Sequence, residues 1–175
     1  MSYERKPIII CVVGPSGSGK TTMARFIEKM LNIPMLVSYT TRPNRDNEVD
    51  GIDHRFVTED QMPSKDEMLA YTNFGGFHYW MPLSELEGAL YSTYVIDENG
   101  LRMLVEKYSD RYLFYSILVK RDRNKLIEQV GEDRVNRDLA RITIPEEEYC
   151  YVIENNGRIE DFLAESFQVF QEILL

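Results

Sequence analysis

Apolar residues recur along the chain in two alternating patterns. Short runs rich in β-branched and aromatic residues predict strands, at residues 8–13, 35–39, 94–97, 112–119 and 149–153. Stretches with helical spacing of apolar residues predict helices that begin at Lys20, after Gly100, at Arg123 and at Ile159. Strands that alternate with helices in this way form a mostly parallel sheet with helices on both faces. We therefore predict an α/β fold with three layers, α/β/α.

The segment 40–82 breaks this alternation. It is rich in Asp, Asn, Gly and aromatic residues, and it contains only two short candidate strands, at 54–57 and 77–80. Open α/β sheets bind ligands beyond the carboxyl ends of their strands. We interpret residues 40–82 as an insertion that carries part of the function.

Length and composition indicate one domain over residues 1–175, because 175 residues with 43% apolar and 28% charged side chains suffice to bury a core. No apolar stretch is long enough to span a bilayer and the amino terminus has no leader pattern, which predicts a cytoplasmic protein without membrane contact. Cys11 and Cys150 are too isolated for a disulfide framework or a metal site, and we expect both to be buried.

The net charge of −9 argues against binding of nucleic acid, because a polyanion is repelled unless positive charge is gathered in one place. A small phosphorylated substrate remains compatible, since the arginines do cluster. They occur at positions 42 and 45 and again at 121, 123, 134, 137 and 141.

A phosphate-binding motif follows the first predicted strand. Residues 14–21 read Gly-Pro-Ser-Gly-Ser-Gly-Lys-Thr, a complete G-x-x-x-x-G-K-[ST] loop, and a helix is predicted directly after it. In such a loop backbone N–H groups surround a phosphate, Lys20 reaches the β- and γ-phosphates, and the Thr21 hydroxyl ligates Mg²⁺. The alternative is a flexible surface turn. The motif predicts a nucleoside triphosphate site formed by Gly14, Ser16, Gly17, Ser18, Gly19, Lys20, Thr21 and Thr22.

Residues 38–57 resemble the guanylate kinases, whose pattern here is S-x-T-T-R-x-x-R-x-x-E-x-x-G-x-D-Y-x-F-V. The resemblance implies a P-loop kinase fold and implies that Ser38, Arg42 and Arg45 bind the phosphate of an acceptor nucleoside monophosphate. Two guanidinium groups three residues apart also suit a phosphate dianion on physical grounds. The alternative is a solvated charged loop.

The resemblance extends to three later segments. Val95-Ile96-Asp97-Glu98-Asn99-Gly100 resembles L-x-I-D-x-Q-G, which implies that Asp97 faces the acceptor or reaches Mg²⁺ through water. Asp97 could instead cap the next helix. Residues 121–138 take the place of a short lid, with Arg134 and Arg137 as its catalytic arginines, while Arg121, Arg123 and Arg141 read as helix-surface charges. Asn155 falls where the family places a residue near adenine.

The base-binding part of the family pattern is altered. Ala70 stands where a carboxylate would pair with guanine, a loss of about 2 to 4 kcal/mol of guanine preference unless another acceptor takes over. Tyr79 matches a phosphate-binding tyrosine, whereas His54 replaces the other one. His54 can donate a hydrogen bond to phosphate and could titrate near neutrality. Trp80 either forms a flat wall for the base or packs beneath the insertion.

Taken together, the resemblance implies an ATP- and Mg²⁺-dependent nucleoside monophosphate kinase with GMP as the first candidate acceptor. Its catalytic residues are Lys20, Arg42, Arg134 and Arg137, and the acceptor site adds Ser38, Arg45, His54, Tyr79 and Asp97. Two alternatives stay open: a kinase for another (d)NMP or a sugar phosphate, and a non-catalytic module that binds a protein partner. We expect small nucleotides as partners, and a monomer or homodimer.

Overall fold

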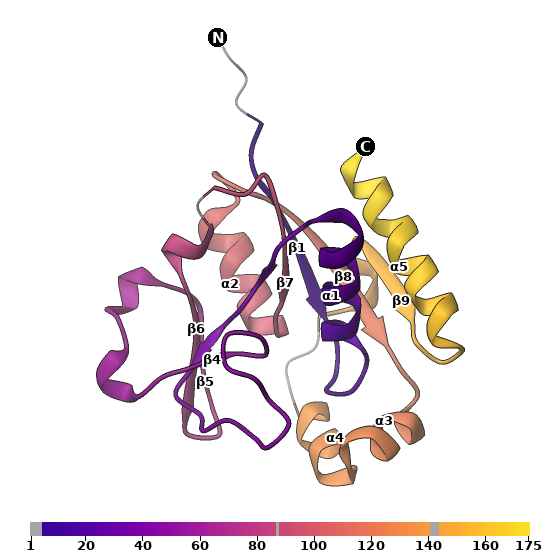
Figure 1. The fold of residues 1–175 in the computed structure, drawn as a ribbon, viewed down its shortest axis with the longest axis horizontal. Coiled ribbons are helices and arrows are strands. Elements are labelled where there is room, and N and C mark those ends of the chain that lie inside the picture. Colours follow the sequence, from indigo (N-terminus) through magenta and orange to yellow (C-terminus); the bar gives the residue numbers. More distant parts are fainter. Residues whose placement is uncertain (1–4, 87, 141–143) are drawn as a thin grey trace.

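The larger of two sheets is entirely parallel. The computed structural model describes residues 5–86, 88–140 and 144–175. Five strands pair in the order β2-β7-β1-β8-β9 (Figure 1). They are β1 (Ile8–Val13), β2 (Met35–Leu36), β7 (Tyr91–Val95), β8 (Leu113–Lys120) and β9 (Tyr151–Glu154). Every residue of the central strand β1 is buried, which explains its continuous apolar run.

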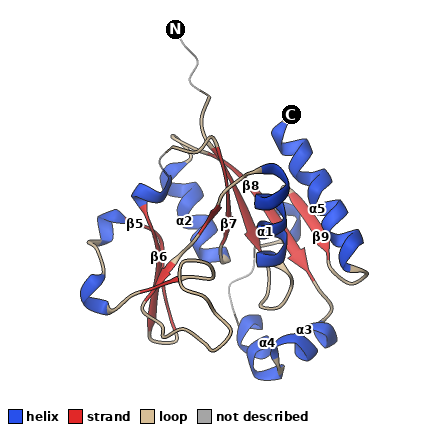
Figure 2. Ribbon diagram, in the orientation of Figure 1, coloured by secondary structure: helices blue, strands red, loops and turns tan. Residues whose placement is uncertain are grey.

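Helices cover both faces of this sheet, so the expected three-layer α/β/α architecture is confirmed (Figure 2). Alternate residues of β1 point to opposite faces. Ile8, Ile10 and Val12 pack with α1 and α5, whereas Ile9, Cys11 and Val13 pack with α2. The helices are α1 (Lys20–Leu31), α2 (Glu98–Tyr108), α3 (Arg123–Val130), α4 (Glu132–Leu139) and α5 (Ile159–Leu174).

A second, four-stranded sheet lies beside the first and is ordered β4-β3-β6-β5. It contains β3 (Tyr39–Thr40), β4 (Arg55–Phe56), β5 (Met68–Phe74) and β6 (Phe77–Pro82). Strands β5 and β6 form an antiparallel hairpin. Leu69 and Met81 from this hairpin join the core that includes α2, so the second sheet is anchored to the body of the protein.

Several boundaries differ from the sequence-based prediction. The expected strand 35–39 is two strands, β2 and β3, in different sheets. The strand expected at 94–97 starts at Tyr91 and ends at Val95, and α2 begins at Glu98 rather than after Gly100. The helix expected from Arg123 is broken at Gly131 into α3 and α4. Cys150 is exposed, contrary to expectation, whereas Cys11 is buried.

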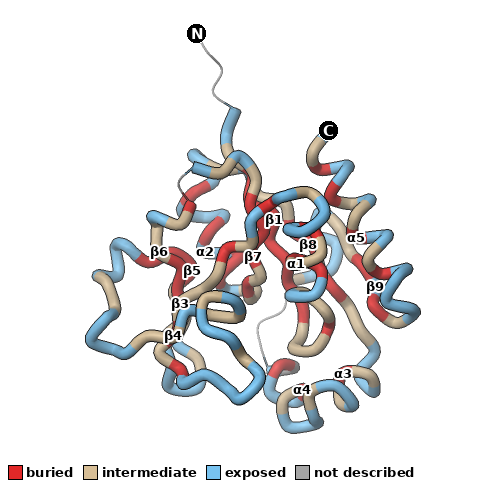
Figure 3. The backbone as a smooth tube through the Cα atoms, in the orientation of Figure 1, coloured by how far each residue is buried: buried red, intermediate tan, exposed pale blue. Residues whose placement is uncertain are grey.

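The carboxyl ends of the parallel strands, the second sheet and the pair α3 and α4 gather at one end of the molecule, while both termini lie at the other (Figure 1). Figure 3 shows that the buried segments concentrate in the strands of the larger sheet and the helix faces turned to it. Within the described part of the chain, no helix is both long and apolar enough to cross a membrane.

Candidate active site

One cleft joins the phosphate loop to the residues expected to bind the acceptor. It lies between the loop, the second sheet and α4. The phosphate loop contributes Gly14, Ser16 and Lys20, and the remaining walls include Ser38, Arg42, Arg45, His54, Tyr79, Asp97, Arg134 and Arg137. Every residue that the sequence assigned to the acceptor therefore borders the same void. We call this void the acceptor cleft.

A second cleft follows the outer side of the phosphate loop and the start of α1. Its lining includes Gly17, Gly19, Thr21, Thr22 and Asn155, which are among the residues expected to hold the donor. We call it the donor cleft. Of the other expected donor residues, Gly14 and Ser16 border the acceptor cleft instead, and Ser18 is fully buried and borders neither cleft. Lys20 borders both clefts and therefore stands between the two predicted substrates.

The phosphate loop is held in shape by contacts with its own backbone and with the end of β9. Lys20 Nζ donates to the carbonyl oxygens of Gly14 and Pro15, both at 2.8 Å. The Asn155 side-chain amide donates to the carbonyl oxygen of Ser18 at 2.8 Å. Gly19 precedes α1 with φ 109°, a conformation that favours glycine.

Gly19→Ala tests this shape directly. A Cβ at position 19 would lie 2.6 Å from Asn155 Nδ2, so we expect the Ser18 to Asn155 bond to break and ATP affinity to fall about tenfold or more. Isothermal titration calorimetry with ATP measures the affinity. Gly88→Ala is the matched control, because Gly88 has φ 102° and nothing within 4 Å of an added Cβ. Equal ATP binding by both variants and wild type would contradict the assignment of this loop.

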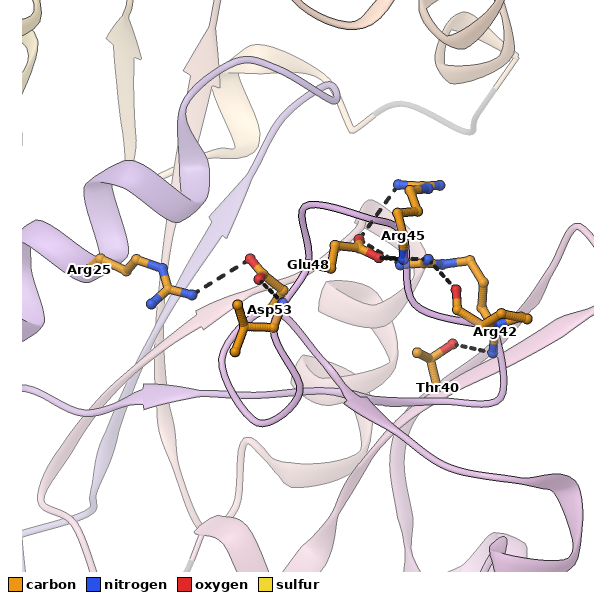
Figure 4. Close-up of polar contacts among 8 residues, drawn as sticks. Arg25, Thr40, Arg42, Arg45, Glu48 and Asp53 are labelled. Atoms are coloured by element: carbon orange, nitrogen blue, oxygen red, sulfur yellow. Dashed lines mark hydrogen bonds and ion pairs between the residues drawn. The ribbon is translucent and has the colours of Figure 1, made fainter.

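A partly buried carboxylate, that of Glu48, orients the acceptor arginines (Figure 4). Arg42 is 9% exposed, and its two terminal nitrogens donate to the two oxygens of Glu48, each at 2.8 Å. The Arg45 backbone N–H donates to Glu48 Oε2 at 2.8 Å, and the Arg45 guanidinium lies 3.7 Å from Oε1. Burial alone would raise the pKa of Glu48, but the bonds from Arg42 and Arg45 hold that pKa below its usual value. Bidentate pairing fixes the plane of the Arg42 guanidinium.

Helix α4 contributes cations to the acceptor cleft. Arg134 is partly buried, and its Nε has no hydrogen-bond partner among the described residues. Burial lowers the pKa of Arg134 most, and the charge of Arg45 lowers it next. Asp138 raises that pKa, and smaller effects come from Arg137, which lowers it, and Glu48, which raises it. The guanidinium groups of Arg45, Arg134 and Arg137 thus all line the acceptor cleft, an arrangement that favours a polyanion.

Two contacts tie α4 to the other walls of the cleft. Asp138 Oδ2 accepts a hydrogen bond from the Ser16 backbone N–H at 2.8 Å, which joins α4 to the phosphate loop. The Arg137 guanidinium carbon lies 5.2 Å from the centre of the Phe74 ring, which joins α4 to β5. The segment expected to act as a lid thus reaches both the donor loop and the second sheet.

Asp97 caps a helix and also borders the acceptor cleft. Its Oδ1 accepts a hydrogen bond from the Gly100 N–H at 2.7 Å, so Asp97 caps α2, and the residue also borders the acceptor cleft. Thr21 borders the donor cleft. A hydroxyl and a single carboxylate are oxygen ligands of the kind that Mg²⁺ takes together with substrate phosphates and water. The described residues contain no cluster of three or more His, Cys, Asp or Glu.

Sequence reasoning missed Arg121 as a site residue. Instead of lying on a helix surface, Arg121 follows β8 directly, and its Nη1 donates to the Gly17 carbonyl oxygen at 3.0 Å in the donor cleft. Its position just beyond the carboxyl end of a central strand was the available signal. Arg123 is exposed and contacts Asn136, as expected of a surface charge. Arg141 lies outside the described residues.

Uncharged side chains also line the acceptor cleft, including those of Ala70, Thr72 and Phe74. Trp80 is 1% exposed and its ring lies 5.8 Å from that of Tyr39, so it packs beneath the insertion, and it also borders the acceptor cleft. Burial lowers the pKa of His54, with a further contribution from Arg42, so its imidazole is neutral at neutral pH in the free protein. The pKa of His54 in the free protein therefore lies below the usual value for histidine.

Comparisons with known proteins agree with this arrangement. The sequence profile of the family described as guanylate kinase matches residues 4–172. The guanylate kinase of Nitrobacter winogradskyi is 31% identical over 187 aligned residues, which cover 98% of this chain and 83% of that protein. The guanylate kinase of Fusobacterium nucleatum is 31% identical over 83% of this chain and 86% of its own length.

A solved structure shares the fold. The crystal structure of guanylate kinase from Anaplasma phagocytophilum superimposes with a TM-score of 0.69 at 24% identity, over 94% of this chain and 83% of that one. The profile match spans nearly the whole chain, and the phosphate loop and the arginine pair that carried the resemblance meet in one cleft. The chain therefore belongs to the guanylate kinase family.

Proposed function

We propose that this protein transfers the γ-phosphoryl group of ATP to a nucleoside monophosphate, with GMP as the first candidate acceptor. The single observation that carries the proposal is that Lys20 borders both the donor cleft and the acceptor cleft. A phosphoryl group bound beside Lys20 faces the cleft that Ser38, Arg42 and Arg45 also line. Two relatives that are 31% identical to this chain, with 83% and 86% of their own length covered, are guanylate kinases.

In the proposed reaction an oxygen of the acceptor phosphate attacks the γ-phosphorus, the bond from that phosphorus to the bridging oxygen breaks, and ADP leaves. Such transfer needs no protein nucleophile, because positioning and charge stabilisation lower the barrier. The loop N–H groups and Lys20 hold the donor phosphates, and Ser38, Arg42, Arg45 and Tyr79 hold the acceptor phosphate. Arg134 and Arg137 offset the charge on the migrating group.

Thr21, and Asp97 through water, would hold Mg²⁺, which supplies charge neutralisation at the β- and γ-phosphates when bound. Asn155 and Arg121 border the donor cleft, and we assign them to the nucleoside part of ATP. We assign residues 40–82 as the acceptor-binding insertion and 121–138 as the lid. Their closure over the substrates would exclude water and limit ATP hydrolysis. A cytoplasmic location, a lack of nucleic-acid partners and a monomeric or homodimeric state stay predictions.

An acceptor panel tests this function. ADP release is measured by a coupled assay with ATP and Mg²⁺ and with GMP, dGMP, AMP, dTMP, CMP or ribose 5-phosphate as the acceptor. We expect turnover with GMP. Activity confined to another (d)NMP would correct the base, and activity confined to ribose 5-phosphate would replace the nucleotide acceptor. A lack of turnover with every acceptor, together with a lack of ATP binding, would favour the non-catalytic module.

A further inference from the structure

His54 lies in the wall of the acceptor cleft with one ring nitrogen unsatisfied. Its Nδ1 is inaccessible to solvent and has no hydrogen-bond partner among the described residues. The rings of Phe56 and Tyr79 approach it edge to face, each with a centroid separation of 5.9 Å, and restrict its orientation. The residue borders the same cleft as Ser38 and Arg42. A buried polar atom without a partner is rare in folded proteins, and an anion bound in the adjoining cleft is a partner that His54 lacks in the free protein.

The charged, polar and titratable groups that face His54 lie on the loop after β3, just before β3 and on β6. Three of these groups lie on the loop that follows β3. Arg42 lowers the pKa of His54, as burial does, whereas Glu48 and Asp53 raise it. The lowering effects are the larger ones. The backbone carbonyl of Ser38, just before β3, also raises that pKa. From β6, the neutral Tyr79 ring faces His54.

Both carboxylates in this environment are already engaged. Glu48 binds Arg42 and the Arg45 backbone N–H, each at 2.8 Å. Asp53 accepts the Val49 N–H at 2.8 Å and pairs with Arg25 of α1 at 3.6 Å (Figure 4). Among the described residues, no carboxylate forms an ion pair with the imidazole. A new anion in the cleft is therefore the change that would favour its protonated form.

We infer that His54 takes up a proton when the acceptor binds, and that the imidazolium so formed helps to hold the dianionic phosphate. This inference rests on the proposed function, because it places the acceptor phosphate among Ser38, Arg42 and Arg45. A phosphate dianion brings two negative charges beside a ring that burial otherwise keeps neutral. The protonated ring then donates from both nitrogens and adds a third cation to the two arginines.

Proton uptake makes acceptor affinity depend on pH with a definite sign. The bound state carries more protons than the free state, so binding weakens as the pH rises. The phosphate group of a nucleotide loses its last proton near pH 6, so above about pH 7 this dependence reports the protein. We expect the Kd of GMP to rise about three- to tenfold between pH 7.0 and pH 8.5.

Calorimetry in two buffers tests the inference. GMP is titrated into the full chain at pH 7.5 in buffers of low and high ionisation enthalpy, and the difference in heat gives the number of protons taken up. We expect about 0.3 to 1 proton per GMP for the wild type. His54→Gln keeps an amide donor but cannot titrate, so we expect GMP binding with almost no proton uptake and a Kd that is nearly constant from pH 7.0 to 8.5.

The other histidine of the chain provides the control. His78 bonds Tyr71 Oη at 2.8 Å and does not border the acceptor cleft, so His78→Gln should take up as many protons as wild type. GMP binding without proton uptake by the wild type, or with equal uptake by His54→Gln, would overturn the role of His54 and leave the kinase proposal intact. Failure of GMP to bind the wild type would overturn the inference together with GMP as acceptor.

Discussion

Lys20→Ala is expected to reduce phosphoryl transfer about 10³-fold while the protein stays folded. Lys20 borders both clefts, so its ammonium group is the one cation of the phosphate loop placed to follow the migrating group. Its bonds in the free protein go to the carbonyl oxygens of Gly14 and Pro15, which lie beside an open cleft where water can replace the lysine. Alanine also suits the first turn of α1.

The coupled ADP assay gives kcat for the variant, and thermal unfolding shows whether it is folded. Lys29→Ala is the matched control, because Lys29 is exposed on the same helix and belongs to neither cleft. It should keep wild-type turnover and a Tm close to that of the wild type. Full activity of Lys20→Ala would refute the assignment of the donor site. A loss of activity that accompanies unfolding would instead assign Lys20 a structural role.

The features that the sequence predicted well are those in which neighbouring residues act together. The phosphate loop is contiguous, so eight residues specify the turn and the start of the helix at once, and β1 and α1 begin and end close to the expected positions. The stop of α1 at Asn32 reflects a residue that tolerates its φ of 55°. The fold class followed from the alternation of such local signals.

The features that the sequence did not predict depend on distant partners or on local irregularity. Arg121 meets Gly17 across 104 positions of the chain, a contact that local spacing cannot indicate. Strand β5 was missed because its register shifts between Leu69 and Thr72, where Ala70 has φ 49° and the apolar alternation is lost. Glu48 was overlooked because its role depends on Arg42 being buried, although an acidic residue three positions after Arg45 was a usable signal.

Replacing Arg134 should separate stability from catalysis. In the free protein its Nε is buried without a hydrogen-bond partner among the described residues, and the charges of Arg45 and Arg137 oppose its own. Arg134→Gln removes that repulsion and one buried charge, so we expect the free energy of unfolding to rise by about 1 kcal/mol. The same change removes one of the cations that offset the negative charge on the transferred phosphoryl group, so kcat should fall about 10²-fold.

Urea unfolding and the coupled ADP assay measure the two effects on one protein preparation. Arg123→Gln is the control, since Arg123 is exposed and its guanidinium bonds Asn136 at 2.8 Å outside the acceptor cleft. Its stability should change by less than about 0.5 kcal/mol and its turnover should stay near the wild-type value. A rise in the free energy of unfolding together with a fall in kcat for Arg134→Gln would mean that the charge repulsion in the free protein is kept because the substrate relieves it. A variant that is less stable yet fully active would show that Arg134 serves the fold alone, and would leave Arg137 as the lid arginine.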